Sequence, residues 1–133
     1  PPRSTLFPYT TLFRSNFKQI NDSYGHVAGD AALCTIVRMI FEHVRADDVV
    51  LRYGGDEFLL MFEEIPEQVF QQKLEDIREE IAMADVPEYK EIRLSMSVGG
   101  VYGSCKVRDG VMEADRLLYQ AKRQKNCVAY KRI

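Results

Sequence analysis

Two short apolar runs flank a glycine pair at 54–55, and this arrangement constrains the fold more than any other feature of the sequence. The apolar runs are 49–51 and 58–62, and the strands expected around them cover roughly 49–53 and 57–62. Apolar runs of strand length joined at Gly-Gly predict a β-hairpin, since glycine suits turns that need positive φ. Their nearly unbroken apolarity favours central strands. Asp56 and Glu57 follow the glycines directly, so we expect two carboxylates at the hairpin tip.

The tip has the composition of a nucleotide–metal site. Gly54 and Gly55 have no side chains, so a bulky ligand can approach the backbone there. Adjacent carboxylates are hard oxygen ligands of the kind that Mg²⁺ accepts alongside substrate phosphates. The ordinary alternative is a solvated turn, because most acidic side chains simply face water.

Periodicity elsewhere predicts an α/β domain. Asp30 is a candidate N-cap, Pro66 stands in the first turn of a helix, and a glycine pair at 99–100 is expected to bend or bulge a strand. Besides the hairpin, the expected elements are helices over 31–44 and 66–84, a strand over 92–98, a helix from Asp109 and a strand over 127–130. This order indicates helices layered on a mixed sheet.

Composition sets further limits. The chain has 133 residues, enough for one domain, and its net charge of −2 gives no basic excess that would favour nucleic acid as a partner. No apolar run reaches the roughly 18 residues of a membrane helix. The three cysteines are scattered without a C-x-x-C pair, which indicates neither disulfides nor a zinc site. We therefore expect a cytoplasmic protein without a membrane segment.

Residues 1–15 differ from the rest of the chain. The sequence starts with Pro1, and Ser-Thr-Leu-Phe at 4–7 nearly repeats as Thr-Thr-Leu-Phe at 10–13. The string STLFPYTTLFRS also resembles the conceptual translation of sequencing-adapter DNA, and such segments are left out of fold reasoning. We expect 1–15 to be an anomalous, artefactual segment and 16–133 to form the domain.

Two motifs carry a family resemblance. Gly-Gly-Asp-Glu-Phe at 54–58 resembles the eponymous motif of GGDEF domains, the diguanylate cyclases that condense two GTP into cyclic di-GMP. Residues 16–30, NFKQINDSYGHVAGD, resemble the second motif of that family, F-K-x-I-N-D-x-x-G-H-x-x-G-D. The resemblance implies a ferredoxin-like, polymerase-palm-related mixed sheet flanked by helices. Compared with that family fold, residues 16–133 would lack the first strand and the helix upstream of it. The resemblance also implies Mg²⁺ or Mn²⁺ as cofactor, a homodimer for catalysis, and a bacterial protein that commonly includes a sensory domain.

The resemblance assigns roles at the hairpin. Asp56 would be a metal ligand, and Glu57 would be a second acid that serves metal binding or activation of the 3′-hydroxyl. Gly54 and Gly55 would form the floor under the phosphates. Catalysis in the family is mainly positioning plus stabilisation of charge by the metal.

The second motif supplies the substrate contacts by the same resemblance. Asn21 and Asp30 would recognise guanine, and a carboxylate can accept from guanine N1–H and its amino group, which adenine cannot match. Phe17 and Lys18 would lie near the phosphates. The structural alternatives are a turn for Asn21 and a helix cap for Asp30.

Two weaker matches lie outside these motifs. Lys122 corresponds to the lysine of the family's phosphate-contacting helix end, and Lys125 is the candidate for its second basic contact, although one residue and a glycine are missing. Arg45 and Asp48 have the Arg-x-x-Asp spacing of the family's inhibitory site, where cyclic di-GMP binds. The alternative is an arginine at a helix end followed by solvated acids.

One element of the family pattern is missing. An Asp-x-Asp should precede the Phe-Lys pair, with its first aspartate as a metal ligand, but those positions hold Phe13 and Ser15. We therefore expect a diguanylate cyclase domain that condenses GTP poorly as this chain stands. Two alternatives stay open: an inactive module that binds GTP or cyclic di-GMP, and a palm-like cyclase that acts on one nucleotide.

Overall fold

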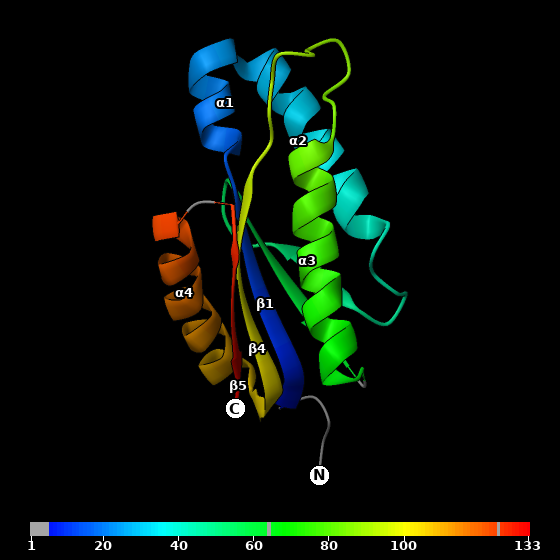
Figure 1. Ribbon diagram of the computed structural model, residues 1–133, viewed down its shortest axis with the longest axis vertical. Coiled ribbons are helices and arrows are strands. Elements are labelled where there is room, and N and C mark those ends of the chain that lie inside the picture. Colours follow the sequence, from blue (N-terminus) through cyan, green and yellow to red (C-terminus); the bar gives the residue numbers. More distant parts are fainter. Residues whose placement is uncertain (1–5, 64, 125) are drawn as a thin grey trace.

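The computed structural model describes residues 6–63, 65–124 and 126–133, and side chains at all of these except 6–8 and 122–124 (Figure 1). Within that part of the chain, four helices flank a five-stranded mixed sheet. In chain order the elements are β1 (Leu6–Ser15), α1 (Phe17–Tyr24), α2 (His26–Phe41), β2 (Val49–Arg52), β3 (Glu57–Phe62), α3 (Glu67–Met83), β4 (Met96–Lys106), α4 (Val107–Gln124) and β5 (Val128–Arg132).

The sheet has the strand order β2-β3-β1-β4-β5. All neighbouring pairs are antiparallel except β4 and β5, which are parallel. The first four strands, with α1 and α2 after β1 and α3 after β3, make the β-α-β-β-α-β arrangement of ferredoxin-like folds. Helix α4 and strand β5 extend it, so the expected fold class is confirmed.

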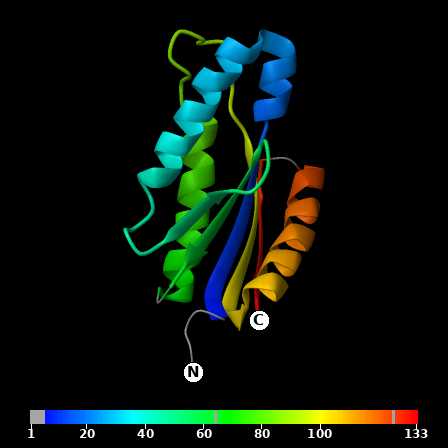
Figure 2. The ribbon, with the colours of Figure 1, turned by 180° about the vertical axis from the view of Figure 1, so that it is seen from behind.

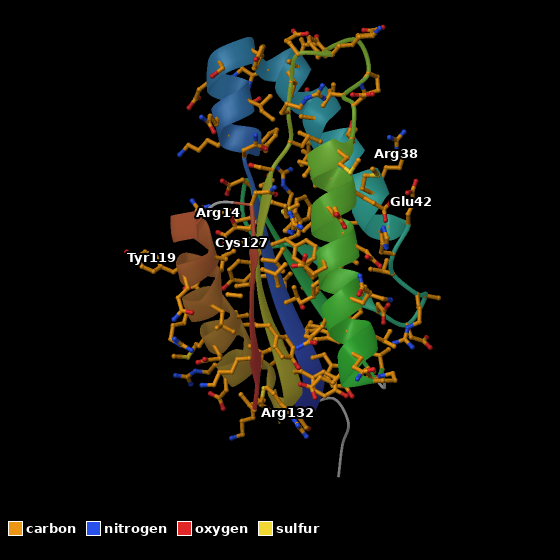
Figure 3. The ribbon with its side chains drawn as sticks, viewed as in Figure 1. Arg14, Arg38, Glu42, Tyr119, Cys127 and Arg132 are labelled. Atoms are coloured by element: carbon orange, nitrogen blue, oxygen red, sulfur yellow. The ribbon has the colours of Figure 1, made fainter. Side chains whose placement is uncertain are left out.

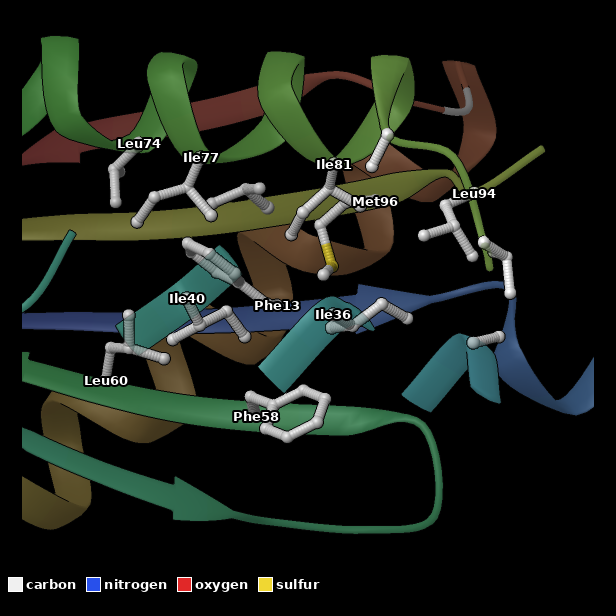
Figure 4. Packing of buried hydrophobic residues seen from close by; sticks show 14 of the residues in the cluster. Phe13, Ile36, Ile40, Phe58, Leu60, Leu74, Ile77, Ile81, Leu94 and Met96 are labelled. Carbon is white, nitrogen blue, oxygen red and sulfur yellow. The ribbon is translucent and has the colours of Figure 1, made fainter. Parts of the chain in front are cut away.

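Helices cover both faces of this sheet (Figures 1 and 2). Helices α2 and α3 pack on one face, where Phe13, Leu60 and Ile77 belong to the larger buried cluster (Figure 4). Helix α4 packs on the other face, where Leu12 and Leu118 belong to a smaller cluster. Successive residues of a strand point to opposite faces, so Leu12 and Phe13 of β1 reach the two separate cores.

The predicted hairpin is present, with β2 and β3 paired in an antiparallel register from Val49↔Met61 to Arg52↔Phe58. Both strands were expected to be central, but only β3 is. Strand β2 lies at the edge of the sheet, and its outer residues Leu51 and Arg52 are exposed. Apolar content alone could not separate an edge strand from a central one, because partner strands on both sides come from distant parts of the chain.

Strand β1 corrects one expectation, because residues 6–15 do not lie outside the fold. Strand β1 occupies the centre of the sheet, between β3 and β4, with Thr11 opposite both Leu60 and Gly100. A β ladder is made from backbone groups, so it accepts any sequence whose side chains fit the two faces. The domain therefore has a first strand, formed by the segment that looked anomalous.

Strand β4 begins at Met96, four residues after the predicted start at 92. Ile92 and Leu94 are buried in the larger core without being in the strand, so their alternation reflects burial and not strand pairing. The Asn16 side chain replaces the strand partner at this point. Its Nδ2 donates to the Arg93 carbonyl at 2.9 Å, and its Oδ1 accepts from the Ser95 amide at 2.9 Å.

The glycines at 99–100 neither bend nor bulge β4, because their pairing with β1 is regular. They allow helices to approach instead. A Cβ on Gly99 would lie 2.3 Å from the Ala114 carbonyl oxygen of α4, and one on Gly100 would lie 2.4 Å from Leu74 of α3. The glycine pair therefore fits two helix contacts, one on each face of the sheet.

The second motif folds into two helices separated by Gly25, whose φ is 91°. Helix α2 starts at His26, so Asp30 lies inside it and is not its N-cap as predicted. Glycine adopts positive φ without a steric penalty, which lets the chain turn between α1 and α2. The following helix, α3, agrees with the prediction, with Pro66 at its N-cap position.

Candidate functional site

A cleft of about 400 Å³ lies at the end of the sheet where β1 passes into α1. Arg14 marks this end of the sheet in Figure 3. The residues that line the cleft are polar or charged. They come from β1, α1, the hairpin tip, the start of β4 and the segment before β5. The lining residues are Arg14, Ser15, Asn16, Lys18, Gln19, Asp22, Asp56, Ser95, Ser97 and Asn126.

The hairpin tip is a loop over 53–56 that is held from both sides. The Tyr53 and Gly54 amides donate to the Glu57 carbonyl at 2.8 and 3.3 Å, and the Ser15 amide donates to the Asp56 carbonyl at 2.8 Å. Strand β1 therefore continues its pairing past the end of β3 and fixes the backbone of Asp56 beside the cleft.

The glycines of the tip do not have the expected positive φ, since among glycines of the described residues only Gly25 and Gly103 do. Instead, the two glycines leave open space beside the backbone of the tip. A Cβ on Gly55 would meet no atom within 4 Å, and one on Gly54 would meet only the Glu57 side chain, at 3.7 Å or more. The tip is thus open to a ligand that approaches the backbone closely.

Arg14 forms an ion pair with the first acid of the tip. Its Nε lies 3.4 Å from Asp56 Oδ2, and the two side chains are 35% and 16% exposed. Arg14 is also the register partner of Glu57 across the β1–β3 ladder. The sequence did not single out Arg14, because its two acidic neighbours lie more than 40 positions away.

The residues at this site do not fit a divalent metal ion. Phe13, at the position where the family motif has its metal-binding aspartate, is fully buried in the larger core. The neighbouring Arg14 supplies a cation instead of a ligand. Within the described part of the chain, no three His, Cys, Asp or Glu side chains are grouped so that they could hold a metal ion. Asp56 and Glu57 are still present at the tip, but the site has one carboxylate fewer than the family pattern, and the Arg14 cation already pairs with Asp56.

Helix α1 brings Lys18 to the lining of the cleft, and its contact with phosphates stays a prediction. Phe17 is buried and does not line the cleft. The Arg52 guanidinium lies 5.7 Å from the centre of the Phe17 ring, and its Nη2 donates to the Gly55 carbonyl at 2.8 Å. A cation–π contact and a hydrogen bond therefore tie the hairpin tip to the start of α1.

Asn21 and Asp30 lie outside the cleft lining, but the fold brings them near each other. Asn21 Oδ1 is buried, with no hydrogen-bond partner among the described residues. A Cβ on Gly29 would lie only 1.6 Å from that oxygen, so α2 contacts Asn21 at the residue directly before Asp30. Asp30 itself is exposed. A buried amide oxygen without a partner is costly, which makes Asn21 a candidate ligand contact.

The two candidate lysines near the end of α4 are described only in part. The Lys122 backbone belongs to α4, but the structure does not describe its side chain. Lys125 is not among the described residues. Asn126, which follows them, lines the cleft, and its Oδ1 accepts from the Met96 amide at 3.3 Å. Sequence reasoning missed Asn126, although its place after the basic helix end was a usable signal.

Arg45 and Asp48 contact each other closely. The Arg45 amide donates to Asp48 Oδ2 at 2.7 Å, and its Nη2 donates to Asp48 Oδ1 at 3.0 Å and to the Glu63 carbonyl. The Asp48 side chain is fully buried, so it is not the solvated acid of the alternative interpretation. Desolvation by burial lowers the pKa of the nearby Lys73, and Arg45 lowers it further, whereas Asp48 raises it.

The fold and the cleft define the class of this molecule: a ferredoxin-like α/β domain with an acid-tipped hairpin beside a polar cleft. The sequence profile of the family described as "Diguanylate cyclase, GGDEF domain" matches residues 12–127. The chain therefore belongs to the GGDEF domain family, and the resemblance carried by its two motifs is confirmed.

Two curated relatives from Escherichia coli K12 are similar to this chain. Diguanylate cyclase DosC is 35% identical over 112 residues, which are 81% of this chain and 24% of DosC. Diguanylate cyclase DgcM is 33% identical over 106 residues, which are 80% of this chain and 26% of DgcM. The chain thus spans about a quarter of the length of these relatives.

Solved structures are also similar. The active GGEEF domain of a diguanylate cyclase from Vibrio cholerae superposes with a TM-score of 0.83 and 25% identity, over 98% of this chain and 85% of that one. The GGDEF domain of DgcB from Caulobacter crescentus, solved in complex with cyclic di-GMP, has a TM-score of 0.82 and 25% identity, over 96% and 78%.

Proposed function

We propose that this domain binds GTP at the cleft and takes part in the diguanylate cyclase reaction, the condensation of two GTP into cyclic di-GMP. The observation that carries the proposal is the meeting of both family motifs at one site. Asp56 of the hairpin and Lys18 of α1 line the same cleft, although they are far apart in the sequence.

Guanine recognition is assigned to Asn21 and Asp30. Support comes from the buried Asn21 oxygen without a described partner and from the contact of Gly29 with it. An amide and a carboxylate can together match the donors and acceptors of guanine, and adenine would leave them unpaired. The phosphates would then extend toward Lys18, with Lys122 and Lys125 as further candidate contacts.

The reaction requires two copies of the domain. Each nucleotide presents its 3′-hydroxyl to the α-phosphate of the other, and each attack releases pyrophosphate. One cleft holds one GTP, so the proposed catalytic unit is a homodimer in which the two clefts face each other. Positioning of the two nucleotides is the main contribution that such a site makes to the rate.

Low activity is part of the proposal, because the donor set beside Asp56 does not fit the divalent metal ion that family enzymes use. An inactive module that binds GTP is the second candidate, and the Arg14–Asp56 ion pair favours it. Product binding at Arg45 and Asp48 also remains a proposal. It has the family spacing in its favour, and the mutual pairing of the two side chains would have to open for a ligand.

A chimera tests the activity. Residues 6–15 are replaced by the corresponding first strand of DosC, which keeps a strand in the sheet, whereas Phe13→Asp alone would bury a carboxylate in the core. Cyclic di-GMP formed from GTP is measured by chromatography, after circular dichroism has shown that both chains fold. We expect at least tenfold more product from the chimera. Equal product from both chains would show that residues 6–15 do not limit turnover.

The origin of residues 1–15 is a separate proposal: this segment was not selected together with the rest of the domain. Phe13 and Ser15 in place of the motif aspartates support it, as do two threonines buried in β1 without hydrogen-bond partners among the described residues, Thr10 and Thr11. An independent read of the source locus across codon 15 tests it. Finding the same codons there would refute an adapter origin.

We also propose that the domain is part of a larger bacterial signalling protein in the cytoplasm. Its relatives are bacterial proteins about four times as long as the matched segment. None of the helices in the described ranges is both long and apolar enough to span a membrane. Sequencing upstream of residue 16 would identify any attached sensory domain.

A further inference from the structure

Arg14 places a permanent positive charge beside both acids of the hairpin. Its Nε donates to Asp56 Oδ2 at 3.4 Å, and it is the register partner of Glu57 on β3. Register partners on antiparallel strands have Cβ atoms about 4.5–5.5 Å apart. A guanidinium stays charged at any pH at which proteins are folded. One fixed cation therefore pairs with Asp56 and lies across the β1–β3 ladder from Glu57.

This cation disfavours a divalent metal ion at the same carboxylate. A guanidinium has donors only and cannot ligate a metal, and its charge repels a second cation at the same carboxylate. Arg14 already neutralises part of the negative charge of the tip, which would otherwise repel phosphate groups.

Arg14 also has donors left for a ligand. A guanidinium carries five N–H donors, and Asp56, which accepts from Nε, is the only partner recorded for this side chain among the described residues. The side chain lines the cleft together with Lys18 and is about one-third exposed. Terminal guanidinium nitrogens bind phosphate oxygens in pairs, with the geometry of a fork.

Arg14 determines whether the net charge of the cleft lining is neutral or negative. Arg14 and Lys18 face Asp22 and Asp56 there, so the described lining is balanced. Removal of Arg14 would leave two acids against one lysine, and such a cleft repels anions.

We infer that Arg14 takes the place of the divalent metal ion, so that the cleft binds the polyphosphate group of a nucleotide without Mg²⁺ or Mn²⁺. The inference rests on the proposed nucleotide site and names a different cation for it. It predicts a nucleotide-binding domain whose affinity for phosphates is set by an arginine of β1.

The experiment measures binding of inorganic triphosphate and of GTP by calorimetry, each in EDTA and in Mg²⁺. The wild-type chain is compared with Arg14→Met, which keeps the apolar stem, and with Arg14→Lys, which keeps the charge. Arg116→Met is the matched control. Arg116 on α4 is also paired with an acid, Glu113, and lies outside the cleft lining. Circular dichroism establishes that each variant is folded.

We expect the wild-type chain to bind both ligands in EDTA, with no gain in affinity from Mg²⁺. Arg14→Met should weaken binding at least tenfold, as expected when charged hydrogen bonds to a ligand are lost. Arg14→Lys should lose less, and Arg116→Met should bind like the wild type.

Two results would overturn the inference. Affinity that rises tenfold or more with Mg²⁺, or that is unchanged in Arg14→Met, would assign the phosphates to another cation. The proposed function fails separately if triphosphate binds through Arg14 but GTP binds no better than ATP, because guanine recognition would then be absent. No binding of either ligand in either buffer would refute both.

Discussion

Arg14 Nε lies 3.4 Å from Asp56 Oδ2, which joins the end of β1 to the tip of the acidic hairpin. The same two segments are joined through the backbone, where the Ser15 amide donates to the Asp56 carbonyl at 2.8 Å. The position of Asp56 is therefore fixed by the backbone, and its charge is balanced by a side chain. These two functions can be separated by mutation.

Asp56→Asn should leave the fold intact and abolish any cyclase turnover. The backbone contacts to Ser15 remain in this variant, and a partly exposed ion pair contributes less than about 1 kcal/mol to stability. Product formation from GTP is measured beside the urea midpoint. Asp22→Asn, which also removes an acid from the cleft lining, serves as the control. A large drop in stability in Asp56→Asn would show that the ion pair is structural.

Gly29→Ala should disturb guanine recognition through Asn21. The new methyl group would lie 1.6 Å from Asn21 Oδ1, so the amide must move. We expect the preference for GTP over ATP to fall about tenfold or more, as calorimetry can measure.

A double-mutant cycle provides the control for this prediction. In the Asn21→Ala background the clash is gone, so Gly29→Ala should then change the affinity for GTP by less than twofold. Equal effects in both backgrounds would mean that Gly29 acts independently of Asn21.

Thr10→Val and Thr11→Val should each stabilise the domain. Both hydroxyls are buried in β1 without a hydrogen-bond partner among the described residues, and valine keeps the shape while removing the unpaired group. The expected gain is about 1 kcal/mol per site, which corresponds to about 3–5 °C in Tm. Thermal unfolding followed by circular dichroism measures it.

Thr35→Val is the matched control for these threonines. Thr35 is also buried, but its Oγ1 donates to the Ala31 carbonyl at 2.9 Å. Removal of this hydroxyl should therefore leave Tm unchanged or lower it. A loss of stability in Thr11→Val would mean that its hydroxyl has a partner after all.

Asp48→Ala should destabilise the domain by about 2 kcal/mol, because the Arg45 amide and guanidinium both donate to this buried carboxylate. Urea unfolding measures the loss. Asp47→Ala, at the exposed neighbouring position, should change stability by less than about 0.5 kcal/mol. Similar values for the two variants would contradict a structural role for the Arg45–Asp48 pair.

Stability should fall as the pH rises above 10, in part because of Tyr130. Burial raises the pKa of this phenol, and the Glu67 carboxylate that accepts its hydrogen bond raises it further. The unfolded chain loses the tyrosine proton at about pH 10. The protonated form is favoured in the folded state, so its contribution is complete below pH 10 and is lost at higher pH.

Tyr130→Phe should therefore make the decline in the urea midpoint between pH 9 and 11 less steep. Tyr119→Phe removes a tyrosine that is 69% exposed and is the control. A slope that is the same in Tyr130→Phe and the wild type would mean that Tyr130 is not responsible for the alkaline loss.

Local patterns in the sequence predicted the hairpin strands β2 and β3 and helix α3 well. In these segments the apolar period, the glycine pair and the proline at 66 lie within the segment itself, so no distant contact is needed to interpret them. The two family motifs are likewise contiguous strings, which is why membership of the GGDEF family could be inferred from 54–58 and 16–30.

Tertiary structure decided what depends on distant partners. Residues 6–15 form a central strand because they pair with β3 on one side and β4 on the other. This pairing uses backbone hydrogen bonds, so it accepts any side chains that fit both faces of the sheet. The glycines at 99–100 matter through α3 and α4, which no local pattern reveals. The sequence by itself determined that the acidic hairpin at 54–58 and the motif at 16–30 belong to one GGDEF domain. Only the fold brought Arg14 to Asp56, because pairing of β1 with β3 juxtaposes residues 42 positions apart.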